Sequence, residues 1–233
     1  MIGLAIDSQE PGNVSQDTAV DPCVCISAGR VDFLDAWELQ KTLHRQVADG
    51  LLSHVLLLLE HPHVYTLGRR GKDSDVLASP DKLLELGAEV HHIDRGGEAT
   101  YHGPGQIVAY PIVDLRKWGG GPLKYVRKLE EVVVATLAEF GIQAESTDRP
   151  TGVWVGGAKI TAIGVRISSG VTMHGFTLNV NPDKSYFDHI VPCGMPEAPV
   201  TTMALELSTE ITVAEVAPVL TYHFGRIFGW RME

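Results

Sequence analysis

An apolar stripe predicts the longest helix of the chain. Apolar side chains recur at positions 126, 129, 133, 137 and 140, a spacing that places them on one face of a helix from Leu123 to Phe140. Gly141 ends this helix, and its apolar face is expected to pack on a sheet. Thr212 and Glu215 have the spacing of a capping box, which predicts a last amphipathic helix that runs toward Phe228.

Two earlier segments are also predicted to be helical. The segment from Asp32 to Ala48 has a helical pattern, and Gly50 just beyond it is a stop signal. Ser79 is suited to an N-cap, with Pro80 at the first helical position and Gly87 closing a short helix.

Strands are predicted between these helices. Residues 23–31 (CVCISAGRV) are predicted to form a short strand. Residues 53–68 are predicted to form buried β-structure that Pro62 interrupts. From Gly152 to Val180 three strands follow, which Gly156-Gly157 and a turn at Ser169-Gly170 join into an antiparallel meander.

The order of these elements indicates an α+β fold, because strands in hairpins are mixed with segregated helices. The expected architecture is a single domain over residues 22–233, with a mixed, largely antiparallel sheet and packed helices. Residues 1–21 are expected to form a mobile N-terminal leader, because they have neither a basic region nor an apolar region typical of a signal peptide.

One lysine interrupts the apolar alternation. If residues 156–167 (GGAKITAIGVRI) form one continuous strand, Lys159 faces the same side as Ile163, Val165 and Ile167, which is the core side. Lysine is almost never buried without compensation, because removing an ammonium from water costs several kcal/mol. The position therefore points to a special role for Lys159.

Composition and charge exclude several classes of protein. The formal net charge of -10 argues against a surface built to neutralise phosphates, so nucleic acid is not expected as a partner. The longest strongly apolar run, Val55 to Leu59, is far short of a membrane span. Three cysteines do not make a disulfide framework and suit a reducing compartment, so a cytoplasmic location is expected.

The cysteines differ in their surroundings. Cys193 lies between a proline and a glycine, which is turn geometry and leaves its thiol within reach of a substrate. Cys23 and Cys25 belong to an interior strand, where a free cysteine is an inert small hydrophobe. An arbitrary cysteine is more often inert than nucleophilic, so this pattern alone leaves both readings open for Cys193.

Two basic residues compete as the partner of Cys193. A two-residue turn at Ser169-Gly170 pairs Val165 with His174 and Lys159 with Val180, which separates His174 from Lys159 along the sheet. Val180 begins the excursion that returns with Cys193, so Lys159 is the better geometric partner. A lone histidine at position 174 is more often a core residue than a base.

Residues 94–115 are rich in glycine. Four glycines and Pro104 within a dozen residues let the backbone approach a ligand closely and leave N–H groups free for an oxyanion, although a plain glycine-rich hairpin has the same composition. The segment is neither a Walker A loop nor a Rossmann fingerprint. The histidines at 61, 63, 91 and 92 do not have zinc-site spacing, so no metal and no cofactor are expected.

Four motifs together resemble a known family. RGGEATYHGPGQIVAYP, GGAKITAIG, MHGFTLNVN and IVPCG, in this order and spacing, are similar to the lipoyl(octanoyl) transferase family, the lipoate biosynthesis protein B type. The resemblance covers roughly residues 25–225. It implies a fold similar to the biotin and lipoate protein ligases, and transfer of octanoyl from octanoyl-acyl carrier protein to a lysine of lipoyl domains.

The resemblance also implies roles for particular residues. Cys193 would carry the acyl group as a thioester, and Lys159 would activate it, as a neutral base or as a charged partner. The acceptors would be the lipoyl domains of 2-oxoacid dehydrogenase complexes and the glycine cleavage H protein. The segments that would line the acyl substrate comprise Arg95, Gly96, Gly97, Glu98, Ala99, Thr100, Tyr101, His102, Ala162, Ile163, Gly164, Gly175, Phe176 and Thr177.

The sequence thus favours an acyltransferase that works in two covalent steps without ATP, because exchange between thioesters is nearly isoenergetic and amide formation is downhill. Two alternatives remain. A lipoate or biotin ligase of similar fold would adenylate its acid and have no need of Cys193. A non-catalytic module would bind the acyl carrier without turnover.

Overall fold

The computed structural model describes residues 20–146, 151–191 and 199–233. Its central element is a mixed six-stranded sheet with the order β10-β11-β6-β2-β1-β12. The strands of this sheet are β1 (Pro22–Arg30), β2 (His54–Glu60), β6 (Gln106–Ile112), β10 (Ile163–Ser168), β11 (Val171–Asn179) and β12 (Arg231–Met232). β1 runs parallel to β2 and β12, whereas β2, β6, β11 and β10 are joined by antiparallel pairs.

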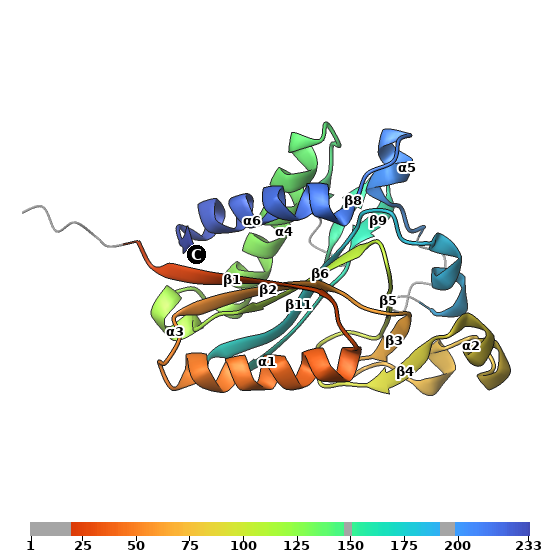
Figure 1. Cartoon of the computed structure of the whole chain (residues 1–233), viewed down its shortest axis with the longest axis horizontal. Coiled ribbons are helices and arrows are strands. Elements are labelled where there is room, and N and C mark those ends of the chain that lie inside the picture. Colours follow the sequence, from red (N-terminus) through yellow and green to blue (C-terminus); the bar gives the residue numbers. More distant parts are fainter. Residues whose placement is uncertain (1–19, 147–150, 192–198) are drawn as a thin grey trace, which may run out of the picture.

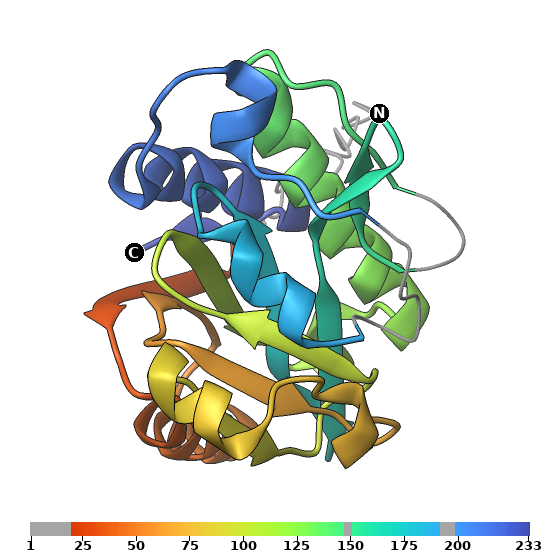
Figure 2. The same cartoon turned by 90° about the vertical axis from the view of Figure 1, so that its right-hand side faces the viewer.

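Helices cover both faces of this sheet (Figure 1). α1 lies on one face, and α4 and α6 lie on the other, as the side view also shows (Figure 2). The helices are α1 (Phe33–Ala48), α2 (Pro80–Leu86), α3 (Leu115–Trp118), α4 (Pro122–Glu139), α5 (Met203–Leu207) and α6 (Val213–Phe228), with 3-10 turns η1 (Asp73–Asp75) and η2 (Lys184–His189). No helix within the described ranges is both long and apolar enough to cross a bilayer.

Side chains alternate between two hydrophobic clusters. On β2, Val55, Leu57 and Leu59 pack toward α1, whereas Leu56 and Leu58 belong to the cluster with α4 and α6. This is why the β2 sequence is apolar without interruption: a strand covered on both faces buries every side chain. Burial of this kind is the main stabilisation of the three layers.

Two small sheets flank the main one. The first has the order β4-β3-β5 and the second β7-β8-β9. Their strands are β3 (Val64–Leu67), β4 (Glu89–His92), β5 (Ala99–His102), β7 (Glu145–Ser146), β8 (Val153–Val155) and β9 (Ala158–Thr161). The prediction of an α+β fold is confirmed, with Pro62 lying between β2 and β3 where the chain leaves the main sheet.

The predicted helices and their caps are confirmed. Ser79 accepts a hydrogen bond from the Lys82 N–H, Gly87 is left-handed at φ +60°, and both halves of the Thr212 capping box are present. The hairpin register at Ser169-Gly170 is also confirmed, because Val165 pairs with His174.

The predicted meander of three strands is wrong. Residues 153–179 form four strands, because the chain crosses between two sheets at Ala162. Thr177 fixes the crossing: its N–H donates to the Ala162 carbonyl at 2.9 Å, and its hydroxyl accepts from the Ala162 N–H at 3.3 Å. Consequently Lys159 does not pair with Val180 but with Trp154, in the β7-β8-β9 sheet.

Candidate active site

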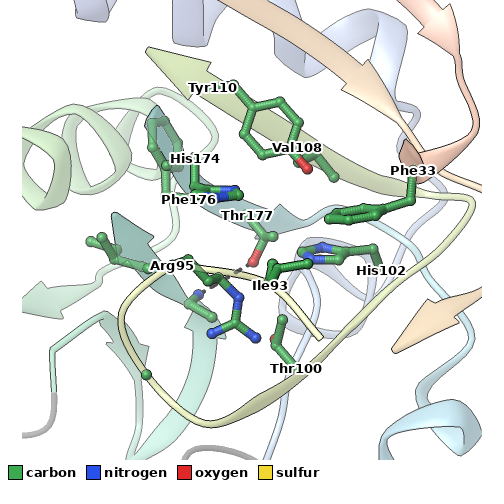
Figure 3. A pocket seen from close by; sticks show the side chains of 15 residues that line it. Phe33, Ile93, Arg95, Thr100, His102, Val108, Tyr110, His174, Phe176 and Thr177 are labelled. Carbon is green, nitrogen blue, oxygen red and sulfur yellow. Dashed lines mark hydrogen bonds between the residues drawn. The ribbon is translucent and has the colours of Figure 1, made fainter. Parts of the chain in front are cut away.

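A pocket opens where the main sheet meets the β4-β3-β5 sheet (Figure 3). It holds about 470 Å³ of empty space, including solvent at its mouth, and most of the exposed lining surface is apolar. The lining residues come from α1, β5, β6, β10, β11 and the loop after β4: Phe33, Ile93, Arg95, Gly97, Thr100, His102, Val108, Tyr110, Ala162, Ile163, Gly164, His174, Gly175, Phe176 and Thr177. Such a cleft suits an aliphatic chain.

Most of the residues expected to line the acyl substrate come together in this pocket. Four do not line it: Gly96, Glu98, Ala99 and Tyr101. Strand alternation explains two of them. Thr100 and His102 face the pocket, whereas Ala99 and Tyr101 point to the other side of β5, into a hydrophobic cluster with Tyr65 and Leu67 of β3.

The other two lie in the loop. The Gly96 N–H donates to the Val165 carbonyl at 3.0 Å, which ties the loop to β10. Glu98 forms an ion pair with Arg70 at 2.8 Å.

Arg95 holds the loop in shape from within. Its guanidinium is 8% exposed and donates to the carbonyls of Thr66 (2.7 Å), Glu98 (2.8 Å) and Gly96 (3.0 Å). It also donates to the Thr66 hydroxyl at 3.0 Å. One planar guanidinium thus bonds two carbonyls of the loop and ties the loop to Thr66 of β3.

Two glycines allow the pocket walls to approach one another. A Cβ on Gly164 would stand 2.9 Å from the Gly96 carbonyl oxygen, and one on Gly175 would stand 2.1 Å from the Ala109 carbonyl oxygen. A Cβ at either position would therefore collide with main-chain atoms that cannot rotate away. This is the physical reason for glycine at these positions.

His174 was not expected in the pocket. Its backbone has φ +56°, which is rare for a residue other than glycine, and its N–H donates to the Gln40 side-chain oxygen at 2.9 Å. Its Nε2 lies 2.8 Å from Asp94, which also pairs with Arg166 at 2.8 Å. Burial lowers the pKa of His174, and the hydrogen bond from His174 lowers the pKa of Asp94. A neutral imidazole that donates to a carboxylate follows from both shifts.

The parity of His174 with Phe176 in the sequence was no guide, because the positive φ of His174 interrupts the alternation and His174 contacts Trp37 and Gln40 of α1, whereas Phe176 packs in the cluster with α4 and α6. Sequence reasoning also missed residues that no local pattern marks. They are Phe33, Ile93, Val108 and Tyr110.

Tyr110 is fixed by a histidine. Its hydroxyl lies 2.8 Å from Nε2 of His61, whose Nδ1 lies 2.6 Å from the Val31 carbonyl. Since a carbonyl only accepts, Nδ1 carries the hydrogen and the Tyr110 hydroxyl donates to Nε2. Burial lowers the pKa of His61 to about 4, so the ring is neutral at physiological pH. Among the described residues no cluster of three or more metal-binding side chains occurs.

Lys159 lies in β9 and is not among the residues that line the pocket. It is 8% exposed, and its Nζ is 5.3 Å from the centre of the Trp154 ring. Its N–H donates to the Pro199 carbonyl at 2.7 Å, and its carbonyl accepts from the Thr201 N–H at 3.0 Å. Ala162, three positions further along the chain, lines the pocket. Because Lys159 is 8% exposed, it lies within the core, as its position in the sequence indicates.

Cys193 lies outside the described residues. The segment that follows is described from Pro199 onward and runs beside β9, with Val200 in a parallel bridge to Lys159. The other two cysteines are in β1. Cys23 is fully buried, and burial raises its pKa to about 12, so it remains a protonated thiol. Burial also raises the pKa of Cys25.

Residues 32–225 match the family model of the lipoyl protein ligase A/B catalytic domain. The octanoyltransferase of Solibacter usitatus is 48% identical over 210 residues, which cover 90% of this chain and 94% of that relative.

Two solved structures have a similar fold. A lipoate protein ligase-like protein from T. acidophilum, solved with lipoic acid, has a TM-score of 0.69 at 14% identity over 92% of this chain and 88% of its own. The biotin protein ligase of Aquifex aeolicus, solved with biotin and ATP, has a TM-score of 0.52 at 15% identity over 88% of this chain and 69% of its own. At such identities the likeness concerns the fold alone.

Proposed function

Because this chain belongs to the octanoyltransferase family with a lipoyl protein ligase A/B catalytic domain, we propose that it transfers octanoyl from octanoyl-acyl carrier protein to a lysine of lipoyl domains. The reaction is the first step of endogenous protein lipoylation. The acceptors are the lipoyl domains of 2-oxoacid dehydrogenase complexes and the glycine cleavage H protein. The proposed location is the cytoplasm, where a thiol nucleophile stays reduced.

The proposed nucleophile is Cys193 and its proposed activator is Lys159. In the first step the Cys193 sulfur attacks the thioester carbonyl, Lys159 takes the thiol proton, and the carrier thiol leaves with that proton. In the second step the acceptor amine attacks the new thioester, Lys159 takes a proton from that amine, and the Cys193 thiol is regenerated. Atoms and protons balance, so ATP is not consumed.

One observation carries this assignment: the Lys159 main chain is hydrogen-bonded to Pro199 and Thr201, which lie shortly after Cys193 in the sequence. A buried lysine therefore stands beside the strand to which the cysteine segment leads. Ala162, three positions after Lys159, lines the pocket and is hydrogen-bonded to Thr177, so we propose that an acyl chain in the pocket has its reacting end toward Lys159.

The pocket is proposed to hold the octanoyl chain. Its apolar walls exclude water from the chain, and the backbone at Gly97, which lines the pocket, is the proposed source of an N–H donor for the oxyanion of each tetrahedral intermediate. We propose that the residues expected from the sequence to line the acyl substrate do so. Arg95, Gly97 and His102 are among those that line the pocket itself.

Mass spectrometry of the intact protein tests the covalent route. Incubation with octanoyl-acyl carrier protein should add one octanoyl group that hydroxylamine removes. Cys193→Ala should abolish the adduct and the transfer, whereas Cys23→Ala should leave both in place. An adduct on Cys23 or Cys25 would contradict the assignment, and dependence of the transfer on ATP would favour a ligase.

The basic residues Arg69, Arg70 and Lys72 are proposed to dock the acidic donor. All three side chains are exposed, and their loop is hydrogen-bonded to the rim of the pocket, with Arg69 N–H donating to the Arg95 carbonyl at 3.0 Å. A protein of net charge -10 needs a local positive patch to attract an acidic partner.

Reversal of charge tests this docking surface. Replacing Arg69 and Arg70 by Glu should raise KM for the carrier, and the effect should be larger at low salt. The matched control replaces Lys128 and Arg231 by Glu, which changes the net charge equally on distant elements. If both double variants change KM to the same extent, the patch has no docking role.

A further inference from the structure

Two buried amides face each other at the ends of two strands. Gln106 begins β6 and Asn179 ends β11, and the two residues are register partners in the main sheet. Gln106 is 1% exposed and Asn179 is 4% exposed. Because a buried amide without partners is costly, the hydrogen bonds of this pair need a complete account.

The hydrogen bonds of the pair run in one direction. The Gln106 side-chain nitrogen donates to Asn179 Oδ1 at 2.9 Å and to the Tyr101 carbonyl at 3.2 Å, so both of its hydrogens are used. The Asn179 nitrogen donates to the Thr201 carbonyl at 3.1 Å. Reversing either amide would place two acceptors or two donors against each other.

A histidine of the pocket is hydrogen-bonded to this pair. Nδ1 of His102 lies 3.0 Å from Gln106 Oε1, and the amide oxygen can only accept, so Nδ1 carries the hydrogen. Burial lowers the pKa of His102 well below its ordinary value, which keeps the ring neutral. The carbonyls of Tyr101 and Thr201 only accept, so they fix the direction of both amides, and His102 donates to the remaining oxygen of Gln106.

This chain of hydrogen bonds ends at residues 199–201, which lie beside Lys159 through a single β-bridge. Thr201 donates its N–H to the Lys159 carbonyl, and Lys159 donates its own N–H to Pro199. Asn179 thus adds a side-chain anchor to residues 199–201, at the point where the segment that contains Cys193 rejoins the described structure.

We propose that Asn179, hydrogen-bonded to Gln106, is a positioning residue for octanoyl transfer, because it holds residues 199–201 in register with Lys159. The proposal rests on the proposed function, in which Cys193 and Lys159 are the reacting pair. His102 lines the acyl pocket, so the same hydrogen bonds join the wall of the pocket to the strand beside the lysine.

Two isosteric variants test the proposal. Asn179→Asp keeps the shape of the side chain, but an ionised carboxylate cannot donate to the Thr201 carbonyl. Gln106→Glu likewise cannot donate to Asn179. Each should lower kcat by about 10- to 100-fold with KM for the carrier nearly unchanged, because a small displacement of a reacting group costs about that much. Alkylation of Cys193 by iodoacetamide should slow in parallel.

The dependence on pH separates positioning from loss of structure. A protonated carboxyl carries one O–H donor and one acceptor oxygen, so it restores both hydrogen bonds in Asn179→Asp and one of the two donated bonds in Gln106→Glu. The ratio of variant to native kcat should therefore rise as the pH is lowered. Folding is measured for each variant by thermal unfolding, and Gln106→Met is included as a variant that introduces no buried charge.

The control is Thr136→Val, which removes a buried hydroxyl bond within α4, far from this site. It should leave kcat unchanged. The proposal is overturned if folded Asn179→Asp and Gln106→Glu keep kcat within about twofold of the native value, or if the ratio does not change with pH. A native protein that shows no acyl adduct would instead contradict the proposed function.

Discussion

Substitution of Lys159 distinguishes the two ways in which this residue can act on Cys193. As a neutral base it takes the thiol proton and then a proton of the acceptor amine. As an ammonium it only stabilises the thiolate, a role that arginine could partly fill. We propose the role of base, because the proposed second step requires a proton acceptor.

The structure sets the expected magnitudes. Lys159 is 8% exposed, and its Cε lies 2.8 Å from the position that a Cβ on Gly152 would occupy, so there is little room around the side chain. Methionine has a similar volume, so Lys159→Met should change the free energy of unfolding by less than about 1.5 kcal/mol. Arginine is larger, and Lys159→Arg should cost about 1–3 kcal/mol through overpacking.

Turnover should fall far more than stability. Loss of a general base lowers the rate by about 10²- to 10⁴-fold, so Lys159→Met should lose that factor in kcat while remaining folded. Lys159→Arg should lose nearly as much turnover, although its charge can keep Cys193 reactive toward iodoacetamide near neutral pH. The assays are octanoyl transfer, thermal unfolding and the pH profile of alkylation.

Two results would refute this reasoning. Robust turnover by Lys159→Arg would exclude a neutral base, and unchanged turnover by Lys159→Met would remove Lys159 from the mechanism. Cys193→Ala serves as the reference for complete loss of the adduct.

Three further predictions follow from single contacts. Gly175→Ala should lower the free energy of unfolding by about 1–3 kcal/mol and weaken acyl binding, because its Cβ would meet the Ala109 carbonyl at 2.1 Å. The control is Gly121→Ala, where a Cβ meets nothing within 4 Å. This control should leave the free energy of unfolding, measured by chemical denaturation, nearly unchanged. The pKa of His61 falls from an ordinary 6.5 to about 4, so the unfolded chain binds a proton that the folded chain does not, and stability of the order of 3 kcal/mol should be lost as the pH falls from about 6.5 to about 4. His61→Asn should flatten that part of the stability profile, and an equal slope in both proteins would contradict the assignment. Peptide mapping after brief treatment of the folded protein with iodoacetamide should find Cys193 modified and Cys23 intact, because burial raises the pKa of Cys23 to about 12.

Local patterns were sufficient for elements whose signals lie within a few residues. The caps at Ser79 and Thr212 and the turn at Ser169-Gly170 depend on hydrogen bonds between near neighbours, and the structure has them as predicted. The apolar spacing in α4 likewise gives its buried face at Leu129, Val133 and Leu137.

The same reasoning failed at Ala162 because the alternation of a strand says nothing about which sheet the strand joins. Lys159 and Val165 have the same parity in the sequence, yet they lie in different sheets. The hydrogen bonds of Thr177 to Ala162, fifteen positions away, decide where the chain crosses.

The motifs in the sequence by themselves determined the family, the pocket loop around Arg95 and the candidate role of Lys159, because each is carried by a short run of residues. Only the tertiary structure decided that Phe33, Tyr110 and His174 share one pocket, and that Gln106 and Asn179 orient each other toward Thr201. These contacts join residues far apart in the chain. Their geometry depends on strand register and on the packing of α1 against the sheet, which no local pattern encodes.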